Sequence, residues 1–233
     1  FAEVPIETAF IYASADADCT FQLWQHFQPE IDGCFAKTIM TDIEIPLIPV
    51  IIEMQKNGIT LEANNLENMS EELQTDMGIL HDSIVSYAGH SLNINSPSQL
   101  SDVLFNELDL PKTKKTKTGY STDANSLEFL KSAHPIIEQI LSYRELSKLK
   151  STYVDALPHM INPDTHRIHT SYNQTGSITG RISSSEPNLQ NIPVRTERGR
   201  KVRNAFVAET RDSLLFAADY SQIELRVLTH LSQ

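Results

Sequence analysis

Two carboxylates near the end of the sequence have spacing that could support catalysis. Asp219 directly follows the apolar run 214–218, which predicts a short buried strand, and Ser221 is a candidate cap for a helix behind it. A carboxylate between a buried strand and a helix can hold a metal ion or a phosphate. The same residue can also simply begin a turn, and the spacing alone does not separate these readings.

Glu224 is the second of these carboxylates. The predicted helix places it on an apolar face formed by Ile223, Val227, Leu228 and Leu231. An unpaired carboxylate on a core-facing stripe would cost several kcal/mol, about the penalty for burying a polar group. A capping box from Ser221 to Glu224 accounts for the residue locally and is the favoured interpretation. The alternative is a site that Glu224 shares with Asp219.

A phenol and a carboxylate, Tyr12 and Asp16, lie one helical turn apart near the start of the chain. The pattern from residue 1 to about residue 35 predicts a helix. Such a pair could position a water and bind a metal ion. The spacing is common, however, and a structural role is the favoured interpretation.

Basic side chains are concentrated in two places that could contact phosphates. The run 112–119 contains no apolar residue and predicts a flexible loop with four lysines, Lys112, Lys114, Lys115 and Lys117. A solvated linker is the competing interpretation. A later helix, 144–157, has an apolar stripe, and Lys148, Ser151 and Thr152 lie off that stripe on a face that suits a sugar-phosphate backbone. The family resemblance given below adds Lys150 to these candidates for DNA contact.

The net charge of −11 hides a division along the chain. Residues 1–110 carry 2 basic and 18 acidic side chains, a balance of −16, whereas residues 111–233 carry 17 and 12, a balance of +5. Localised basic charge matters more than net charge for binding a polyanion. The second half of the chain is therefore expected to face a polyanion.

Composition excludes several classes of protein. The hydrophobic fraction of 40% is ordinary for a globular protein, and no apolar run approaches the ~20 residues that cross a bilayer. Two cysteines, Cys19 and Cys34, make neither a disulfide framework nor a zinc site, so a reduced cytoplasmic setting is the default. The sequence starts with Phe1 and stops after an apolar helix, which favours a piece of a longer protein.

The elements between these residues are mostly helical by periodicity. Helices are predicted over 41–57 with a glycine cap at Gly58, over 66–84 with a solvated acidic face, from Ser96-Pro97, and over 136–157. A strand is predicted over 167–172, and a second around 202–207. Between them, 175–193 is rich in serine, threonine, asparagine and proline and predicts a loop.

Several motifs in order resemble the bacterial DNA polymerase I family, the family A DNA polymerases. They are Thr179-Gly-Arg-Ile-Ser-Ser184, Pro187-Asn-Leu-Gln-Asn-Ile-Pro193 and Asp219-Tyr-Ser-Gln-Ile-Glu-Leu-Arg226. The resemblance extends to the lysine run and to Lys148-Leu-Lys-Ser-Thr-Tyr153. The segment Tyr12 to Asp18 is similar to the last motif of that family's proofreading exonuclease, with Asp16 as a metal ligand. Each motif alone is weak to moderate, but the series is specific and covers essentially the whole chain.

The resemblance implies roles for the polymerase residues. Asp219 corresponds to a palm aspartate that binds both magnesium ions, and Glu224 to the residue that excludes ribonucleotides. Tyr220, Ser221 and Gln222 would join Glu224 at the deoxynucleoside triphosphate site. The lysine run and the 144–157 helix correspond to the thumb, which grips primer-template duplex DNA. Donors for the primer terminus and the minor groove would be Arg181, Asn188, Gln190, Asn191 and Arg195; every base pair offers acceptors there.

The implied fold is α+β and mainly α. We expect a helical exonuclease remnant over 1–40, a long-helix thumb over 41–160, and over 161–233 an incomplete antiparallel palm sheet. The second palm aspartate and the nucleotide-binding helix of the family are absent from the sequence, so this polypeptide is expected to bind duplex DNA but to incorporate no nucleotide. It would be a monomer, with association through unburied faces possible, in the bacterial cytoplasm at the nucleoid.

Other functions remain open from the sequence. The main alternative is a non-catalytic, sequence-independent DNA-binding module. A proofreading nuclease and a single-subunit RNA polymerase are two enzymatic alternatives. Glu224 argues against the RNA polymerase if its steric role carries over.

Overall fold

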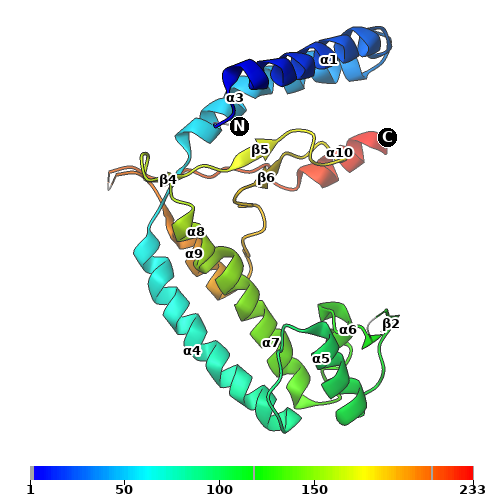
Figure 1. The fold of residues 1–233 in the computed structure, drawn as a ribbon, viewed down its shortest axis with the longest axis vertical. Helices are drawn as coiled ribbons and strands as arrows, with labels where there is room; N and C mark the ends of the chain where they lie inside the picture. Colours follow the sequence, from blue (N-terminus) through cyan, green and yellow to red (C-terminus); the bar gives the residue numbers. More distant parts are fainter. Residues whose placement is uncertain (1–2, 118, 211, 233) are drawn as a thin grey trace. The chain divides into compact units, whose positions relative to one another are not determined.

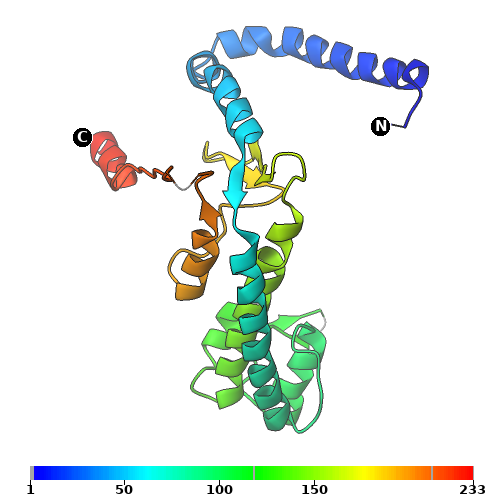
Figure 2. The same cartoon turned by 90° about the vertical axis from the view of Figure 1, so that its left-hand side faces the viewer.

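The computed structural model describes residues 3–117, 119–210 and 212–232. The chain divides into two compact units, drawn in Figures 1 and 2. Unit 1 comprises Phe1–Asn57 and Tyr172–Ser183, and unit 2 comprises Gly58–Ser171 and Ser184–Gln233. These units do not test the three regions predicted from the sequence, 1–40, 41–160 and 161–233, which stay predictions.

Unit 1 is built mainly from helices: α1 (Ile6–Asp32), α2 (Ala36–Ile39), the π-helical η1 (Met40–Glu44) and α3 (Ile45–Asn57). The helices predicted to residue 35 and over 41–57 are confirmed. Gly58 follows α3 with φ 56°, as expected for a glycine that ends a helix. No helix in the described part of the chain is both long and apolar enough to cross a lipid bilayer.

Two long helices of unit 2 pack side by side in opposite directions (Figures 1 and 2): α4 (Ala63–Ala88) and α7 (Pro135–Leu149). The π-helical η3 (Lys150–Val154) and α8 (Ala156–His159) continue α7. Apolar side chains at helical spacing form the core between them: Leu66, Met69, Leu73 and Met77 from α4, and Leu146, Leu149, Tyr153 and Leu157 from the other side. The predicted apolar stripes of both helices are confirmed.

A second core lies at the far end of this helix pair. It is formed with α5 (Pro97–Asp102), the π-helical η2 (Val103–Glu107) and α6 (Ala124–Glu128), and it buries Ile84, Leu100, Phe105, Leu127, Ile136 and Ile140. Helix α5 begins at Ser96-Pro97, as predicted. The Ser126 amide donates to the Asp123 carboxylate at 2.7 Å, which caps α6.

Short strands complete the fold. Strand β1 (Ile59–Leu61) lies antiparallel between β4 (Arg167–Ile168) and β7 (Phe206–Val207), with Ile59 opposite Ile168 and Thr60 opposite Val207. Strand β5 (Ser171–Asn173) pairs with β6 (Ser183–Ser185). The structure is thus α+β and mainly α, as predicted.

The prediction of a flexible loop for the lysine-rich run is wrong in part. Strand β2 (Lys115–Thr116) pairs with β3 (Gly119–Tyr120), so the run forms a hairpin. Two features of the described residues favour pairing of these two strands. Gly119 has φ 138°, which side-chain-bearing residues rarely adopt, and the amide of the next residue, Tyr120, donates to the Ser101 hydroxyl at 3.0 Å.

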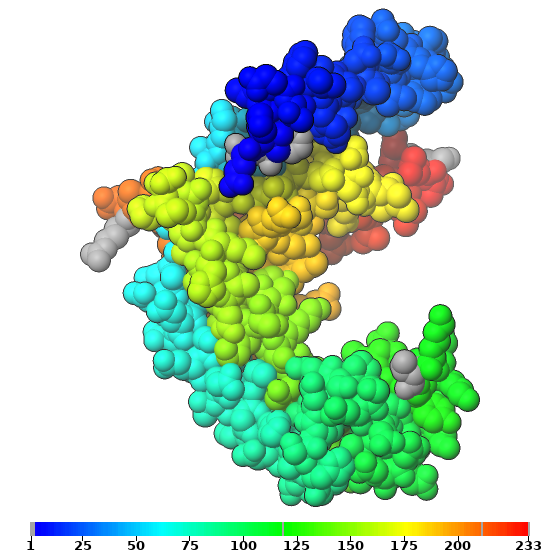
Figure 3. All heavy atoms as spheres, in the orientation of Figure 1, coloured from blue at the N-terminus to red at the C-terminus, as the bar shows by residue number. Residues whose placement is uncertain are grey.

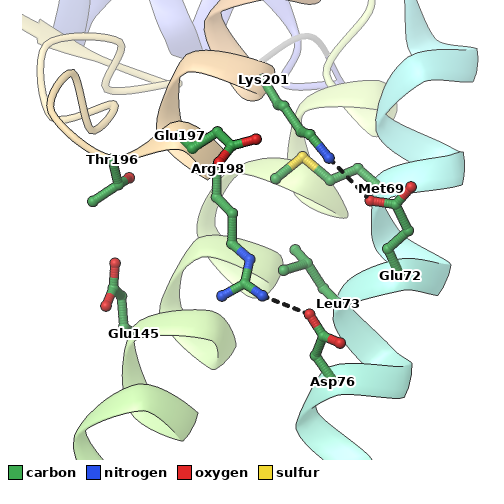
Figure 4. A pocket seen from close by; sticks show the side chains of 9 residues that line it. All are labelled: Met69, Glu72, Leu73, Asp76, Glu145, Thr196, Glu197, Arg198 and Lys201. Atoms are coloured by element: carbon green, nitrogen blue, oxygen red, sulfur yellow. Dashed lines mark hydrogen bonds and ion pairs between the residues drawn. The ribbon is translucent and has the colours of Figure 1, made fainter.

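Helix α9 (Glu197–Asn204) corrects two further expectations. The strand predicted to include Val202 begins only at Phe206; Val202 is a buried residue of this helix, which Thr196 caps through the Gly199 amide at 3.1 Å. Two residues of the acidic face of α4 are not simply solvated. Arg198 contacts Asp76 at 2.5 Å and Lys201 contacts Glu72 at 3.3 Å, beside a pocket of about 400 Å³ (Figure 4).

The chain end differs most from its prediction. Residues 214–218 form no strand, and Leu214 and Phe216 are each 92% exposed. A strand needs a hydrogen-bonded neighbour, and none of the strands among the described residues pairs with this segment. Helix α10 (Ile223–Leu231) begins after Gln222, whose φ is 49°, and this N-cap residue makes no side-chain cap, so the predicted N-cap at Ser221 is wrong. The face expected to be core-facing has no buried residue.

Candidate nucleic-acid interface

The hairpin presents a concentrated positive charge. Its four lysines, Lys112, Lys114, Lys115 and Lys117, are all exposed. In the space-filling view of Figure 3 the bright green hairpin projects from the surface around it. Within the hairpin, the Ser121 amide donates to the Lys114 carbonyl at 2.8 Å, and the Thr113 hydroxyl donates to the Ser121 carbonyl at 2.6 Å. Exposed ammonium groups on a hydrogen-bonded support are well placed to contact phosphates.

Tyr120 joins this hairpin to the core of unit 2. Its ring meets the buried Phe105 edge to face at 5.3 Å between centroids. The Lys112 ammonium lies 5.5 Å from the centroid of the same Tyr120 ring. That distance is within the range of a cation–π contact. The strand β3 is therefore fixed on the protein side, while β2 faces solvent.

Arg144 ties helix α7 to two loops. Its guanidinium donates to the Thr122 carbonyl, to the Thr122 hydroxyl at 3.4 Å and to the Ile94 carbonyl at 3.4 Å. Burial lowers the pKa of Arg144 below its usual value, although a guanidinium stays charged at any physiological pH. No sequence pattern indicates this role, because the partners lie 22 and 50 residues away.

A groove of about 770 Å³ lies beside this contact. Its walls come from the loop before α5, from the hairpin and its return, and from one face of α7 and η3; the lining residues include Asn95, Thr116, Tyr120, Arg144, Ser147, Lys148 and Ser151. The structure thus brings Lys148 and Ser151 to the same groove as the hairpin. Thr152 is exposed next to Ser151 but does not line the groove.

Lys150 differs from the other predicted phosphate ligands. Its ammonium contacts the Asp155 carboxylate at 2.8 and 3.1 Å, and Asp155 also accepts from the Ser70 hydroxyl of α4 at 2.7 Å. Burial opposes ionisation of Asp155, but the hydrogen bonds from Lys150 and Ser70 hold its pKa below the usual value. Lys150 therefore has a structural contact that accounts for its position in the helix.

The polar loop that contains the predicted minor-groove donors is anchored by apolar residues. Leu189 packs against the core and Ile192 is buried, so the residues between and around them point outward. The exposed ones include Asn188, Gln190, Asn191 and Arg195. The Gln190 amide donates to the Asn188 side chain at 3.0 Å, an Asx turn that orients this stretch. Arg181 is exposed in unit 1.

Four polar side chains among the described residues are buried without any signal for it in the sequence: Ser101, Thr122, Thr170 and Ser184. Ser101 accepts from the Tyr120 amide of β3, and Thr122, which follows that strand, accepts from Arg144. Thr170 and Ser184 contact the polar loop. Buried hydroxyls are costly unless they are hydrogen-bonded, and these four are. Nothing in the sequence separates them from the many exposed serines and threonines nearby.

The predicted nucleotide-site residues lie together in sequence at the start of α10. Asp219, Tyr220, Ser221, Gln222 and Glu224 are all exposed. Arg226 donates to the Ser221 carbonyl at 3.1 Å, which closes the turn before the helix.

The described residues do not by themselves fit a magnesium centre. No group of three histidine, cysteine or acidic side chains gathers closely enough among them to hold a metal ion. Asp219 offers one carboxylate, and Mg²⁺ is usually held by one or two carboxylates whose coordination is completed by water and substrate phosphates. Asp16, the second predicted metal ligand, is exposed on α1, as is Tyr12 one turn before it.

The sequence is similar to known proteins over its whole length. The family model for DNA polymerase family A matches residues 63–233. DNA polymerase I of Synechocystis sp. is 47% identical over 235 residues, covering 100% of this chain and 24% of the relative. DNA polymerase I of Geobacillus stearothermophilus is 50% identical over 195 residues, covering 84% of this chain and 22% of the relative.

A solved structure is similar in fold. It is the POL domain of Pol1 from M. smegmatis in complex with DNA primer-template and dNTP, with a TM-score of 0.78 and 43% sequence identity. The match covers 90% of this chain and 36% of that chain. This chain therefore spans about a quarter of the curated relatives and about a third of the solved one.

Proposed function

Because this chain belongs to DNA polymerase family A, we propose that it grips primer-template duplex DNA for an enzyme that extends a primer 3′-hydroxyl with deoxynucleotides. The observation that carries the proposal is the groove beside the lysine hairpin. It joins Lys148 and Ser151 to a hairpin with four exposed lysines. The similar structure from M. smegmatis is a complex with DNA primer-template and dNTP, which supports the choice of ligand.

The groove and hairpin would contact the sugar-phosphate backbone. Ammonium groups neutralise phosphates and release counterions without reading the base sequence. Hydroxyls such as that of Ser151 donate to phosphate oxygens and fix the register of the duplex. A copying enzyme has to hold any sequence, and a grip of this kind meets that requirement.

The polar loop would contact the minor groove. The acceptors there, N3 of purines and O2 of pyrimidines, occur at every base pair. Asn188, Gln190 and Asn191 carry amide donors that match them, and Arg181 and Arg195 carry guanidinium donors. These contacts depend on the correct shape of a base pair more than on its identity. They would therefore support both sequence-independent binding and sensitivity to a mispaired primer end.

Asp219 is proposed as one carboxylate ligand of the polymerase magnesium site, and Glu224 as the residue beside the sugar of the incoming nucleotide. Tyr220, Ser221 and Gln222 would line the same nucleotide site. When bound, the metal ions would position and neutralise phosphates. The described residues supply too few ligands for that chemistry. We therefore expect the chain alone to bind duplex DNA without incorporating nucleotides.

A non-catalytic DNA-binding role is the second candidate for the chain alone. The exposed lysines of the hairpin and the groove beside them favour it, because they suit contact with a nucleic-acid backbone and need no catalytic group. Template-directed incorporation by the purified chain with Mg²⁺ would contradict this view of the fragment. For the N-terminal helices, the pair Tyr12 and Asp16 is proposed as part of a nuclease-like site, and the same assay would detect nuclease activity as shortening of the primer.

The test of the proposed grip is equilibrium binding of the chain to fluorescent primer-template duplexes of unrelated sequence. We expect similar affinity for all sequences and a steep decrease of affinity with salt. Salt-independent binding, or a strong preference for one sequence, would contradict the proposal. A protein with this substrate would work in the bacterial cytoplasm at the nucleoid, as a monomer on each primer end.

A further inference from the structure

A short chain of buried hydrogen bonds fixes the backbone of the polar loop on its protein side. Thr170 follows β4 and is 6% exposed, and Ser184 of β6 is 3% exposed. Their hydroxyl oxygens lie 2.7 Å apart. The Thr170 hydroxyl is also 2.8 Å from the Pro187 carbonyl, and the Leu189 amide donates to the Ser184 hydroxyl at 3.2 Å.

These distances fit one consistent direction of donation. Each hydroxyl has a single proton. The Leu189 amide donates to Ser184, Ser184 donates to Thr170, and Thr170 donates to the Pro187 carbonyl. Longer contacts exist from Thr170 to the Ser185 carbonyl at 3.0 Å and from Ser184 to the Pro187 carbonyl at 3.2 Å. Every polar atom of the shorter chain is satisfied in this arrangement.

The two ends of this chain lie on either side of Asn188. The Pro187 carbonyl belongs to the peptide group before Asn188, and the Leu189 amide belongs to the peptide group after it. Fixing both peptide groups limits the directions in which the Asn188 side chain can point. The Asn188 side chain in turn accepts from the Gln190 amide at 3.0 Å, so the restraint extends to Gln190.

We propose that Thr170 and Ser184 are positioning residues that set the loop 187–191 for contact with the minor groove of DNA. The inference rests on the proposed function of that loop. Neither hydroxyl is placed to contact DNA itself, because both are buried. Their effect on binding goes through the backbone on both sides of Asn188.

Thr170→Val removes the hydroxyl and keeps the shape of the side chain. It removes the donor that lies 2.8 Å from the Pro187 carbonyl and leaves that carbonyl only the longer contact from Ser184 at 3.2 Å, whereas Thr170→Ser keeps the shorter one. Ser185→Ala is a matched control, because Ser185 is an exposed neighbour that contributes its backbone carbonyl, not its hydroxyl, to the hydrogen bonds described here. Ser184→Ala is the second test variant and removes the other hydroxyl of the same chain.

The readout is binding of the chain to two duplexes, one native and one with purines replaced by 3-deazapurines, which lack the minor-groove N3 acceptor. The wild-type chain is expected to bind the native duplex more tightly. In Thr170→Val and Ser184→Ala the affinity for the native duplex should fall about three- to tenfold, as for one or two net hydrogen bonds. The preference for the native duplex over the 3-deazapurine duplex should vanish. Thr170→Ser and Ser185→Ala should keep the wild-type preference, and the salt dependence should be the same in all variants.

Two results would separate the possible failures. If the two hydroxyl-deleted variants keep the wild-type preference for the native duplex, the positioning role is wrong, whatever their thermal stability. If the wild-type chain itself binds both duplexes equally, the proposed minor-groove contact is wrong, and this inference falls with it. Amide exchange of Leu189 checks the structural part without DNA: faster exchange in Ser184→Ala supports the hydrogen-bond chain, and unchanged exchange overturns it.

Discussion

Arg144 donates hydrogen bonds to both the backbone carbonyl and the hydroxyl of Thr122, and so joins helix α7 to the residues that follow the lysine hairpin. The same guanidinium reaches the Ile94 carbonyl in the loop before α5. Three segments that are distant in sequence thereby meet at one side chain. The groove proposed to contact the sugar-phosphate backbone depends on this meeting, because all three segments line it.

Replacing Arg144 should loosen the hairpin. Arg144→Gln removes a charged donor that is partly buried and leaves the Thr122 carbonyl short of a partner, so the free energy of unfolding should decrease by about 1–3 kcal/mol. Denaturant titration measures this change, and amide exchange of Tyr120 and Ser121 reports on the hairpin itself. Arg203→Gln, a charge loss at an exposed site, is the control and should have little effect on either. Equal effects from the two substitutions would contradict the role of Arg144 in holding the three segments together.

Gly119 should be difficult to replace. An added Cβ would come within 2.8 Å of the Ser101 hydroxyl, and the backbone φ of 138° is unfavourable for alanine. Gly119→Ala should therefore destabilise the chain by about 1 kcal/mol or more. Gly180→Ala is a suitable comparison, since Gly180 also has positive φ, 76°, but open space around it. A smaller loss of stability at Gly119 than at Gly180 would contradict the described hairpin.

Lys148 and Lys150 should behave differently although they are two residues apart. Lys148→Ala should leave stability nearly unchanged and reduce the slope of log affinity against log salt by about 0.9, the value for one phosphate contact. Lys150→Ala should mainly lower stability, because it leaves Asp155 without its cation. Thermal melts and duplex titrations of both variants measure the two effects. The reverse pattern would contradict the assignment of Lys148 to the groove.

Asp155 should make the stability of the chain depend on acid pH. Its pKa is lowered in the folded state, so its contribution is present above the unfolded-state pKa of about 3.9 and is lost as pH falls through the lower folded-state value. Asp155→Asn should thus be less stable than the wild type at pH 7, and the difference should shrink towards pH 3. Denaturant titrations across this range measure it. A difference that grows on acidification would contradict the described contacts with Lys150 and Ser70.

The helices could be predicted from the sequence because their signals are local. The stripe from Leu66 to Met77 and the start at Ser96-Pro97 depend on neighbours within a few turns, and both are confirmed. The conformation of residues 214–218 could not be predicted from the sequence, because an apolar run becomes a strand only where another strand pairs with it. The hairpin could not be predicted, because four lysines indicate a solvated loop, whereas Gly119 and the Ser101 contact stabilise pairing.

In the candidate site, too, local features could be predicted from the sequence and long-range contacts could not. Lys148 and Ser151 could be assigned to a common surface because they lie on one helix face opposite Leu149 and Tyr153. The assignment of Lys150 to that surface could not be checked from the sequence, since its partner Asp155 is bonded to Ser70 of a helix 85 residues earlier in the chain. The contacts of Arg144 and Thr170 are tertiary in the same way. Local patterns give the residue types of this interface, and long-range hydrogen bonds give its shape.

The most direct test of the proposed grip is the salt dependence of duplex binding with and without the hairpin charges. The variant replaces Lys112, Lys114, Lys115 and Lys117 by Gln, and a control replaces the ion-paired Lys37, Lys131 and Lys201 by Gln. We predict that the hairpin variant loses affinity for every duplex sequence alike and that its log–log salt slope falls by roughly three to four, about 0.9 for each lost phosphate contact. The control should keep a slope near that of the wild type. An unchanged slope in the hairpin variant would contradict the account.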